Sequence, residues 1–252
     1  DADLKERTKE ILHVIQKEKE VTVSRLSERF GVSEVTIRKD LFELEQQGLI
    51  LRTHGGAMAI TEKNAPHYFA RIRIETEEKE KIAKAAAELI RDGDSVLVDA
   101  GSTALAVARL LKPKHISIVT NSIPVCAELH DFNGTLSMTS GEMLKGTLAL
   151  TGPDTEAYLD KVQVDKLILG ASGFRPDLGF TTSSAILAAV KKKMIRASQT
   201  VILVVDHTKF TSNKLAHFAD FRDIDIVVTS RLIPEEALNV LREHNVQVVL
   251  TP

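Results

Sequence analysis

The stretch Gly-Val-Ser-Glu-Val-Thr-Ile-Arg-Lys-Asp-Leu, residues 31–41, decides the fold of the first part of this chain. Ser33 is a suitable N-cap, because its hydroxyl can accept a hydrogen bond from an amide of the first helical turn. Gly31 permits a tight chain reversal before the cap. Three apolar residues then recur at i, i+4 and i+7: Ile37, Leu41 and Leu44. This order of turn, cap and apolar stripe is typical of the second helix of a helix-turn-helix.

The other side chains near the start of this helix face outward and are candidates for contact with DNA. Hydroxyl and guanidinium groups on the first exposed turns of such a helix can reach phosphates and base edges in a major groove. On this helix the candidates are Ser33, Glu34, Thr36, Arg38 and Lys39. An ordinary solvated amphipathic helix would show the same pattern, so the flanking sequence has to decide between the two interpretations.

The flanking sequence predicts a winged helix. Apolar spacing indicates a first helix over residues 4–18 and a second helix capped by Thr22, and the third helix extends to Gly48. Residues 49–53 and 57–60 then read as two strands on either side of a tight reversal. This wing would present three more candidates to the DNA backbone or the minor groove: Arg52, Thr53 and His54.

These first sixty residues resemble the DNA-binding domain of DeoR-family bacterial regulators. The matching motifs are Ser33-x-x-Thr36-Ile37-Arg38-Lys39-Asp40-Leu41-x-x-Leu44, Gly48-Leu49 and Arg52-Thr53-His54-Gly55-Gly56. The family often has an acidic residue that completes a capping box in the second helix. Arg25 occupies that position here, so we expect Thr22 to cap this helix alone. The resemblance implies sequence-specific binding to double-stranded operator DNA.

Charge is the main argument against a nucleic-acid partner. Residues 1–60 contain ten Lys and Arg residues and eleven Asp and Glu residues, which gives a net charge of −1. The cations Arg38, Lys39 and Arg52 nevertheless lie where DNA would bind. Asp40 beside them either orients these cations or forms a helix-surface ion pair. We therefore expect modest non-specific affinity and stable binding only as a homodimer or homotetramer.

Composition excludes several classes of protein. With 252 residues, of which 43% are hydrophobic and 27% charged, and a net charge of −2, we expect a soluble protein of more than one domain. No apolar run approaches the ~20 residues of a membrane span and no signal segment begins the chain, so we expect a cytoplasmic protein without membrane contact. The single cysteine, Cys126, lies in an apolar helical context and is expected to pack rather than react.

Residues 61–74 read as a polar linker with a proline, and residues 75–252 as a second domain. Strands and helices alternate in this second domain, which predicts a Rossmann-like, mostly parallel α/β sheet. The expected strands are residues 95–98, 116–120, 135–139, 166–170, 200–205, 225–229 and 246–251. The expected helices are residues 75–91, 103–111, 123–130, 154–161, 183–197 and 234–244.

Small polar residues follow the ends of five of these strands. Ligands of parallel α/β sheets bind beyond the carboxyl ends of the strands, where these residues would converge. Helix 103–111 begins beside a glycine and two hydroxyls, and its free amides suit a phosphate. The candidates for effector binding are Asp99, Gly101, Ser102, Thr103, Thr120, Asn121, Gly141, Gly152, Gly170, Asp206 and Lys209. Taken singly, such loops also serve as plain strand-to-helix turns.

The same strand ends resemble the C-terminal sensor domain of the DeoR family, which shares the fold of ribose-5-phosphate isomerase and glucosamine-6-phosphate deaminase. The matching motifs are Lys79-x-x-Ile82-Ala83, Asp99-x-Gly101-Ser102-Thr103, Thr120-Asn121, Gly141, Gly152-Pro153, Gly170-Ala171 and Asp206-x-Thr208-Lys209-Phe210. The resemblance implies that residues 101–103 hold the phosphate of a sugar phosphate. It also implies four side chains around the sugar: Asp99, Asn121, Asp206 and Lys209. Residues 187–189 are apolar where the family usually has an acid, which leaves the sugar unidentified.

These observations predict a transcriptional regulator, a repressor of a carbohydrate-metabolism operon, whose operator binding changes with a phosphorylated sugar. The alternative is a sugar-phosphate isomerase-like enzyme with a DNA-binding module, because Asp99, Asp206 and Lys209 could act in proton transfer. A third interpretation is a winged helix used for protein interaction, which a salt-sensitive, sequence-specific DNA complex would exclude.

We expect no enzymatic activity, no cofactor and no metal site, since no cluster of His, Cys and Glu residues has the spacing of metal ligands. His207 is expected in the ligand loop or on the surface. The three lysines at residues 191–193 are expected on a solvated face, with Lys191 or Lys192 able to tilt toward the ligand.

Overall fold

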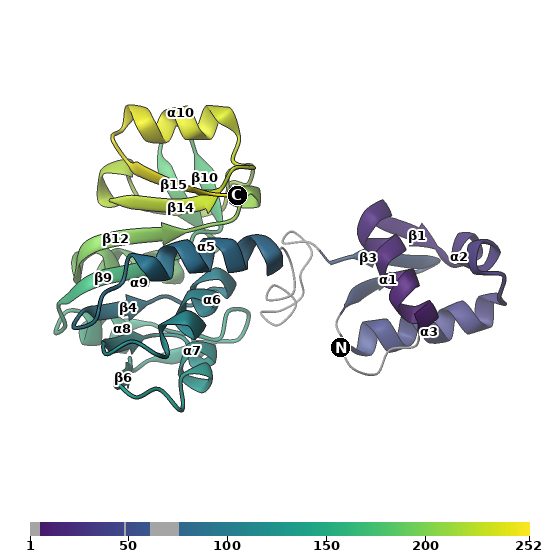
Figure 1. Ribbon diagram of the computed structural model, residues 1–252, viewed down its shortest axis with the longest axis horizontal. Helices are drawn as coiled ribbons and strands as arrows, with labels where there is room; N and C mark the ends of the chain where they lie inside the picture. The colour runs from purple at the N-terminus through teal and green to yellow at the C-terminus, as the bar shows by residue number, and fades with distance from the viewer. Residues whose placement is uncertain (1–5, 48, 61–75) are drawn as a thin grey trace. The chain divides into compact units, whose positions relative to one another are not determined.

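The computed structural model describes residues 6–47, 49–60 and 76–252 of the chain. The chain divides into two compact units, Asp1–Ile74 and Glu75–Pro252 (Figure 1). The predicted linker, residues 61–74, and the predicted helix end at Gly48 lie outside the described residues. Within the described part of the chain, no helix is long and apolar enough to cross a membrane.

The N-terminal unit is a winged helix-turn-helix, as the sequence predicts. Its helices are α1 (Glu6–Glu18), α2 (Val23–Phe30) and α3 (Glu34–Gln46). Its antiparallel sheet has the order β1-β3-β2, with β1 at Glu20–Thr22, β3 at Gly56–Ala59 and β2 at Ile50–Thr53. The predicted wing has only β2 and β3. The sequence does not reveal β1, because a strand of three residues is too short for a recognisable alternation.

The predicted N-caps Thr22 and Ser33 and the predicted reversal at Gly31 are confirmed. The Oγ1 of Thr22 accepts a hydrogen bond from the backbone N of Arg25 at 3.3 Å. The Oγ of Ser33 accepts one from the backbone N of Thr36 at 3.3 Å. Gly31 between the two helices has φ of 63°, the left-handed region that favours glycine. Side chains from all three helices and the sheet share one core, which includes Ile11, Ile15, Val21, Leu26, Ile37, Leu41, Leu44 and Ile50.

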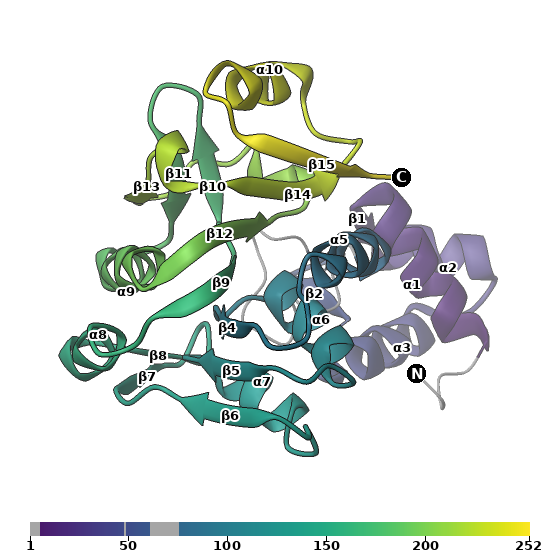
Figure 2. The same cartoon turned by 60° about the vertical axis from the view of Figure 1, so that its left-hand side comes forward.

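The C-terminal unit is built on a seven-stranded parallel sheet with the order β15-β14-β12-β9-β4-β5-β6 (Figure 2). Its strands are β4 (Ser95–Val98), β5 (Ser117–Thr120), β6 (Thr135–Met138), β9 (Val164–Leu169), β12 (Ser198–Val204), β14 (Ile226–Ser230) and β15 (Gln247–Thr251). All seven predicted strands lie in this sheet, so the predicted fold class is confirmed. The strand order reverses between β4 and β9.

Helices cover both faces of this sheet, with α5 and α6 on one face and α8 and α9 on the other (Figure 2). The helices are α5 (Thr76–Glu88), α6 (Ser102–Leu111), α7 (Ile123–Glu128), α8 (Pro153–Leu159), α9 (Ala185–Arg196) and α10 (Glu235–Glu243). Two short 3-10 helices are η1 (His207–Lys209) and η2 (Phe221–Asp223). The six helices begin and end within a few residues of their predicted positions.

Two smaller antiparallel sheets are absent from the sequence prediction. One is the hairpin of β7 (Glu142–Leu144) and β8 (Ala149–Thr151). The other contains β10 (Gly173–Arg175), β11 (Gly179–Thr182) and β13 (Ala216–Ala219). Strands of three or four residues give little periodicity. Phe174 and Phe180, with ring centroids 5.5 Å apart, join the second of these sheets to the main core.

Candidate functional site

The outer face of α3 is the candidate surface for reading DNA. Ile37, Leu41 and Leu44 are fully buried, as the spacing predicts. Four exposed side chains lie on the opposite side of the helix: Val35, Arg38, Lys39 and Phe42. At about 100° per residue these four fall within an arc of roughly 100°, so they form one continuous face. The prediction identifies Arg38 and Lys39 on this face but does not include Val35 or Phe42.

The remaining predicted residues of α3 lie beside this face. Glu34 forms an ion pair with Arg38 across one helical turn, with Oε2 and Nη2 2.7 Å apart and both side chains largely exposed. The hydroxyls of Ser33 and Thr36 are 2.9 Å apart at the cap. In the free protein, therefore, Glu34 engages the guanidinium that would contact DNA. An exposed pair of this kind contributes only a few tenths of a kcal/mol, so DNA phosphates or bases can displace it.

Asp40 has a different role from either predicted one. It is 3% exposed, and its carboxylate accepts hydrogen bonds from Nε and Nη2 of Arg7 at 2.7 and 3.0 Å. This two-bond pair joins α1 to α3. The prediction that Asp40 pairs on the helix surface or orients Arg38 and Lys39 is wrong, because the partner is 33 residues away in the sequence and local spacing cannot reveal it.

The wing places its predicted residues at the hairpin of β2 and β3. Arg52 and His54 are exposed and Thr53 is half-buried. Close packing excludes any side chain at Gly56. A Cβ there would lie 1.9 Å from the carbonyl oxygen of Val21, because β1 passes close beside it. Adjacent Gly55 has open space around the same position. The close approach of β1 to β3 therefore requires glycine at residue 56.

In the C-terminal unit, the candidate effector site lies where the strand order reverses, between β4 and β9. Ligands of open α/β sheets bind at such a switch point. Asp99 follows β4 and Gly170 follows β9, and the backbone N of Gly170 donates to Oδ2 of Asp99 at 3.1 Å. The structure thus brings together two predicted residues that are 71 positions apart.

Lys191 of α9 completes this cluster. Its Nζ donates to Oδ2 of Asp99 and, at 2.8 Å, to the carbonyl oxygen of Gly170. The side chains of Lys191 and Asp99 are 7% and 4% exposed, so this is a buried ion pair. The prediction of a solvated lysine run is therefore wrong for Lys191, which takes the alternative orientation toward the candidate site, whereas Lys192 is exposed. Helical spacing could have predicted that Lys191 is buried, because it lies four residues after buried Leu187 and three before buried Met194.

The predicted phosphate cradle lies beside Asp99. Gly101 is the N-cap of α6 and provides no side-chain cap, so the first amides of the helix lack a side-chain acceptor at this position. Ser102 is half-buried and Thr103 is 7% exposed. A Cβ at Gly101 would meet nothing within 4 Å, so there is open space beside this residue. Amides at a helix N-terminus attract an anion through their partial positive charge.

Two predicted residues lie at the end of β5, Thr120 as its last residue and Asn121 just after it, and both take part in buried hydrogen bonds. Thr120 donates from Oγ1 to the carbonyl oxygen of Val98 at 2.7 Å, which is a structural role within the sheet. Asn121 is 1% exposed and donates from Nδ2 to the carbonyl oxygen of Leu150 at 3.1 Å. The Oδ1 of Asn121 is buried without a hydrogen-bond partner. Of the two residues, Asn121 has the spare acceptor that a sugar hydroxyl could use.

The predicted glycines of the irregular segment flank the hairpin of β7 and β8. Gly141 has φ of 128°, and a Cβ there would lie 2.1 Å from Oγ1 of Thr155. Close packing alone therefore explains this glycine. Gly152 has φ of 95° and is the N-cap of α8, again without a side-chain cap. Neither geometry tests their predicted role in binding a ligand.

Asp206 and Lys209 lie in the loop after β12, the strand next to β9. Asp206 is fully buried, and its Oδ1 accepts hydrogen bonds from the backbone N and the hydroxyl of Thr208. Lys209 places its Nζ 3.4 Å from Oδ2 of Asp206. Burial alone would raise the pKa of Asp206, but the positive charges of Lys209 and Lys79 and the hydrogen bonds from Thr208 outweigh it, so this pKa lies below its ordinary value.

Glu78 and Ser230, which no sequence motif indicates, help to attach the same loop to α5. Glu78 is 8% exposed and accepts hydrogen bonds from the backbone N of His207 at 2.9 Å and from Oγ of Ser230 at 2.6 Å. The Nδ1 of His207 lies 2.8 Å from the other oxygen of Glu78. His207 is thus half-buried and fixed in place rather than a free surface histidine.

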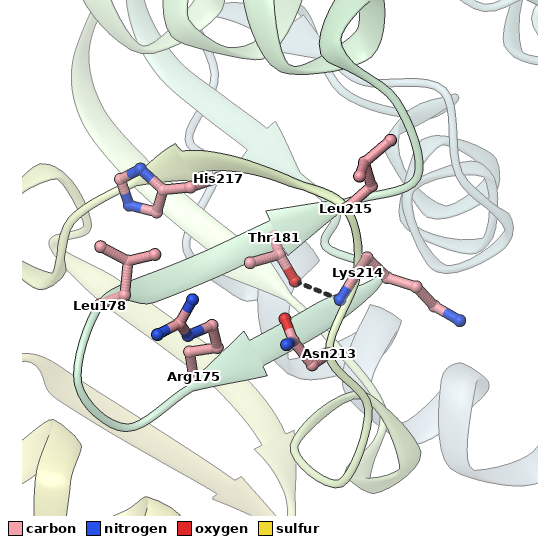
Figure 3. Close-up of a pocket in the computed structure, with 7 residues that line it drawn as sticks. All are labelled: Arg175, Leu178, Thr181, Asn213, Lys214, Leu215 and His217. Atoms are coloured by element: carbon pink, nitrogen blue, oxygen red, sulfur yellow. Dashed lines mark hydrogen bonds between the residues drawn. The ribbon is translucent and has the colours of Figure 1, made fainter.

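A separate hollow of about 340 Å³ lies at the small sheet of β10, β11 and β13 (Figure 3). It is lined by Arg175, Leu178, Thr181, Asn213, Lys214, Leu215 and His217. The Oγ1 of Thr181 accepts a hydrogen bond from the backbone N of Lys214 at 3.0 Å across this hollow. It contains none of the predicted effector residues.

Other potentially reactive groups have ordinary surroundings. Cys126 is half-buried, and burial raises the pKa of its thiol, which disfavours the nucleophilic thiolate. No group of three His, Cys, Asp or Glu side chains that could hold a metal ion occurs among the residues that the structure describes.

Two family descriptions match this chain. Residues 7–63 match the DeoR-like helix-turn-helix domain, and residues 74–231 match the DeoR C terminal sensor domain. The first match covers the candidate DNA-binding surface on α3 and the wing, and the second covers the candidate effector site.

Relatives match over most of the chain. The transcriptional repressor AccR of Agrobacterium fabrum is 37% identical over 89% of this chain and 88% of its own length. The glycerol-3-phosphate regulon repressor of Escherichia coli is 34% identical over 95% of this chain and 96% of its own. Among solved structures, ribose 5-phosphate isomerase A of Methanocaldococcus jannaschii has a TM-score of 0.39 and 18% identity over 54% of each chain, a likeness of fold alone.

Proposed function

The chain belongs to the DeoR family of transcriptional regulators, and we propose that it represses a carbohydrate-metabolism operon under the control of a phosphorylated sugar. The observation that carries the DNA-binding part is the outer face of α3, where Arg38 and Lys39 project opposite a fully buried apolar stripe. A recognition helix needs this arrangement, because one side has to pack on the domain while the other enters the major groove.

The effector part of the proposal rests on the cluster at the strand reversal. The amides at the start of α6 and the hydroxyls of Ser102 and Thr103 offer donors to a phosphate. The spare acceptor of Asn121 suits a sugar hydroxyl. The glycerol-3-phosphate regulon repressor, a relative over nearly the whole chain, is named for a small phosphorylated polyol. We propose a ligand of that chemical class, without a cofactor.

Further parts of the proposal follow from operator recognition. An operator with two half-sites requires a protein with two-fold symmetry, so we propose a homodimer or homotetramer, held together through the C-terminal unit. The protein would act in the cytoplasm, where its DNA lies. The ligand changes DNA binding only if its affinity differs between the DNA-competent and DNA-incompetent arrangements.

We propose that the effector site is not catalytic. Isomerisation of a sugar phosphate needs a carboxylate that is free to accept a proton from carbon and has a pKa near the working pH. The carboxylate of Asp99 is paired with Lys191. The pKa of Asp206 lies below its ordinary value, which makes Asp206 a weaker base. Absence of aldose–ketose turnover with a panel of sugar phosphates is the expected result.

Arg38→Ala is expected to weaken specific operator binding by about 1–3 kcal/mol, because a guanidinium that pairs with a base edge contributes about that amount to discrimination. Arg38→Lys keeps the positive charge but loses the two-bond geometry of the guanidinium. Compared with Arg38→Ala, it should therefore recover only the affinity that comes from attraction to DNA phosphates. Fluorescence anisotropy with operator and scrambled duplexes measures both. Arg109→Ala, at an exposed arginine of the C-terminal unit, is the control. Wild-type discrimination in Arg38→Ala would refute base reading by this residue.

Thr103→Val is expected to abolish the response to the phosphorylated sugar while leaving operator affinity unchanged, because it removes one hydroxyl from the cradle and preserves side-chain shape. The measurement is operator release against increasing concentrations of fructose 6-phosphate, glucose 6-phosphate, glycerol 3-phosphate and inorganic phosphate. Thr135→Val, at an exposed threonine of β6, is the matched control. A dose response in Thr103→Val equal to that of the control would rule out the cradle.

A further inference from the structure

Two large apolar side chains are exposed on the outer face of α3. Val35 is 73% exposed and Phe42 is 52% exposed. Among the described residues of the N-terminal unit, these are the exposed large apolar side chains. A single exposed valine is common on protein surfaces, so its meaning depends on its position. Packing does not explain Val35, because the buried stripe of α3 lies on the opposite side of the helix.

Val35 lies at the leading end of the recognition helix. It is the second residue of α3, and the N-terminal residues of a recognition helix are those that contact base edges. The polar side chains around it are engaged with one another, Glu34 with Arg38 and Ser33 with Thr36. An apolar side chain therefore projects from a first turn in which these polar groups are already paired.

We propose that Val35 contacts the C5-methyl group of a thymine in the operator and is a determinant of sequence specificity. This inference rests on the proposed reading of DNA by α3. In the major groove, thymine alone among the four bases presents a methyl group. A valine in a helix holds one strongly preferred χ1 rotamer, so its two methyl groups are in place before contact. Burial of the two apolar surfaces against each other favours thymine at that position.

Phe42 lies on the same face but seven residues further along α3, which is about 10 Å along the helix axis. At that distance from the leading end it is not placed to reach the base that Val35 meets. Phe42 is therefore a matched control, since it is an exposed apolar residue of the same helix without the proposed contact.

The test replaces operator thymines one at a time by deoxyuridine, which lacks only the C5-methyl group and still pairs with adenine. The full-length protein and its Val35→Ala and Phe42→Ala variants are titrated at one salt concentration against duplexes of the DNA upstream of its own gene. At one thymine position per half-site, removal of the methyl group should lower the affinity of the wild-type protein for the duplex about fourfold, which corresponds to about 0.8 kcal/mol. That substitution should leave binding by Val35→Ala unchanged and still weaken binding by Phe42→Ala about fourfold.

Three results would overturn the proposal. They are an equal methyl effect in wild type and Val35→Ala, no methyl effect at any thymine, and a methyl effect that disappears in Phe42→Ala instead. The Val35→Ala variant is expected to fold like the wild type, because Val35 is exposed and alanine has the higher helix propensity. Specific binding without methyl dependence contradicts only the proposed role of Val35 and leaves the proposed function in place. Absence of any specific DNA binding contradicts the proposed function as well, so the two failures are distinguishable.

Discussion

Lys191→Met is expected to destabilise the C-terminal unit by about 3–5 kcal/mol, the cost of removing one partner from a buried ion pair. The variant leaves Asp99, 4% exposed, without its cation, and leaves the carbonyl oxygen of Gly170 without a donor. Methionine fills a similar volume, so a cavity contributes little. The loss comes from an unpaired charge and an unsatisfied acceptor.

Urea unfolding monitored by circular dichroism measures this effect, and two variants sharpen it. Lys192→Met changes the neighbouring exposed lysine and should shift the midpoint little. Asp99→Asn together with Lys191→Met removes both charges and should recover much of the loss, because replacement of a whole buried pair is often close to neutral. A Lys191→Met midpoint equal to that of Lys192→Met would show that the pair does not stabilise the fold.

Gly56→Ala is expected to abolish operator binding and to destabilise the N-terminal unit by about 1–3 kcal/mol or more. The added Cβ would lie 1.9 Å from the carbonyl oxygen of Val21 and 2.9 Å from the Cα of Thr22, both of which are backbone atoms. A backbone neighbour cannot rotate away, so β1 has to separate from β3. Since β3 pairs with β1 on one side and β2 on the other, separation of β1 from β3 also displaces the wing.

Gly55→Ala is the matched control for this variant. It adds the same methyl group one residue earlier, where nothing lies within 4 Å, and should bind operator like the wild type. Anisotropy with operator DNA and thermal unfolding of both variants give the comparison. If Gly56→Ala binds and melts like Gly55→Ala, the close approach of β1 to β3 is not a feature of the protein in solution.

Local sequence patterns account for most of the architecture. The inner strands of the large sheet, such as β4 and β14, are largely buried, so each is a short apolar run between turn residues and can be recognised alone. The caps at Thr22 and Ser33 depend on contacts three residues away, which spacing reveals. The strands that the prediction lacks, such as β1 and β10, have three residues each and are defined by their partners rather than by their own pattern.

The candidate sites were less predictable, because their decisive contacts join distant parts of the sequence. Asp99 could be selected from its place after a strand, but its partner Lys191 is 92 residues away. Asp40 likewise pairs with Arg7 rather than with its neighbours. In both cases the sequence identifies a charged residue at an informative position, and only the fold shows which opposite charge it meets.

The most direct test of the central claim is anisotropy of the DNA upstream of the protein's own gene, titrated at fixed salt with a panel of sugar phosphates and the matching free sugars. We expect specific, salt-sensitive binding that one phosphorylated sugar alters and its free sugar does not. Specific binding that no sugar phosphate alters, together with no sugar-phosphate binding by the C-terminal unit, would contradict the effector assignment. Absence of specific DNA binding would contradict the assignment of this protein as an operator-binding repressor.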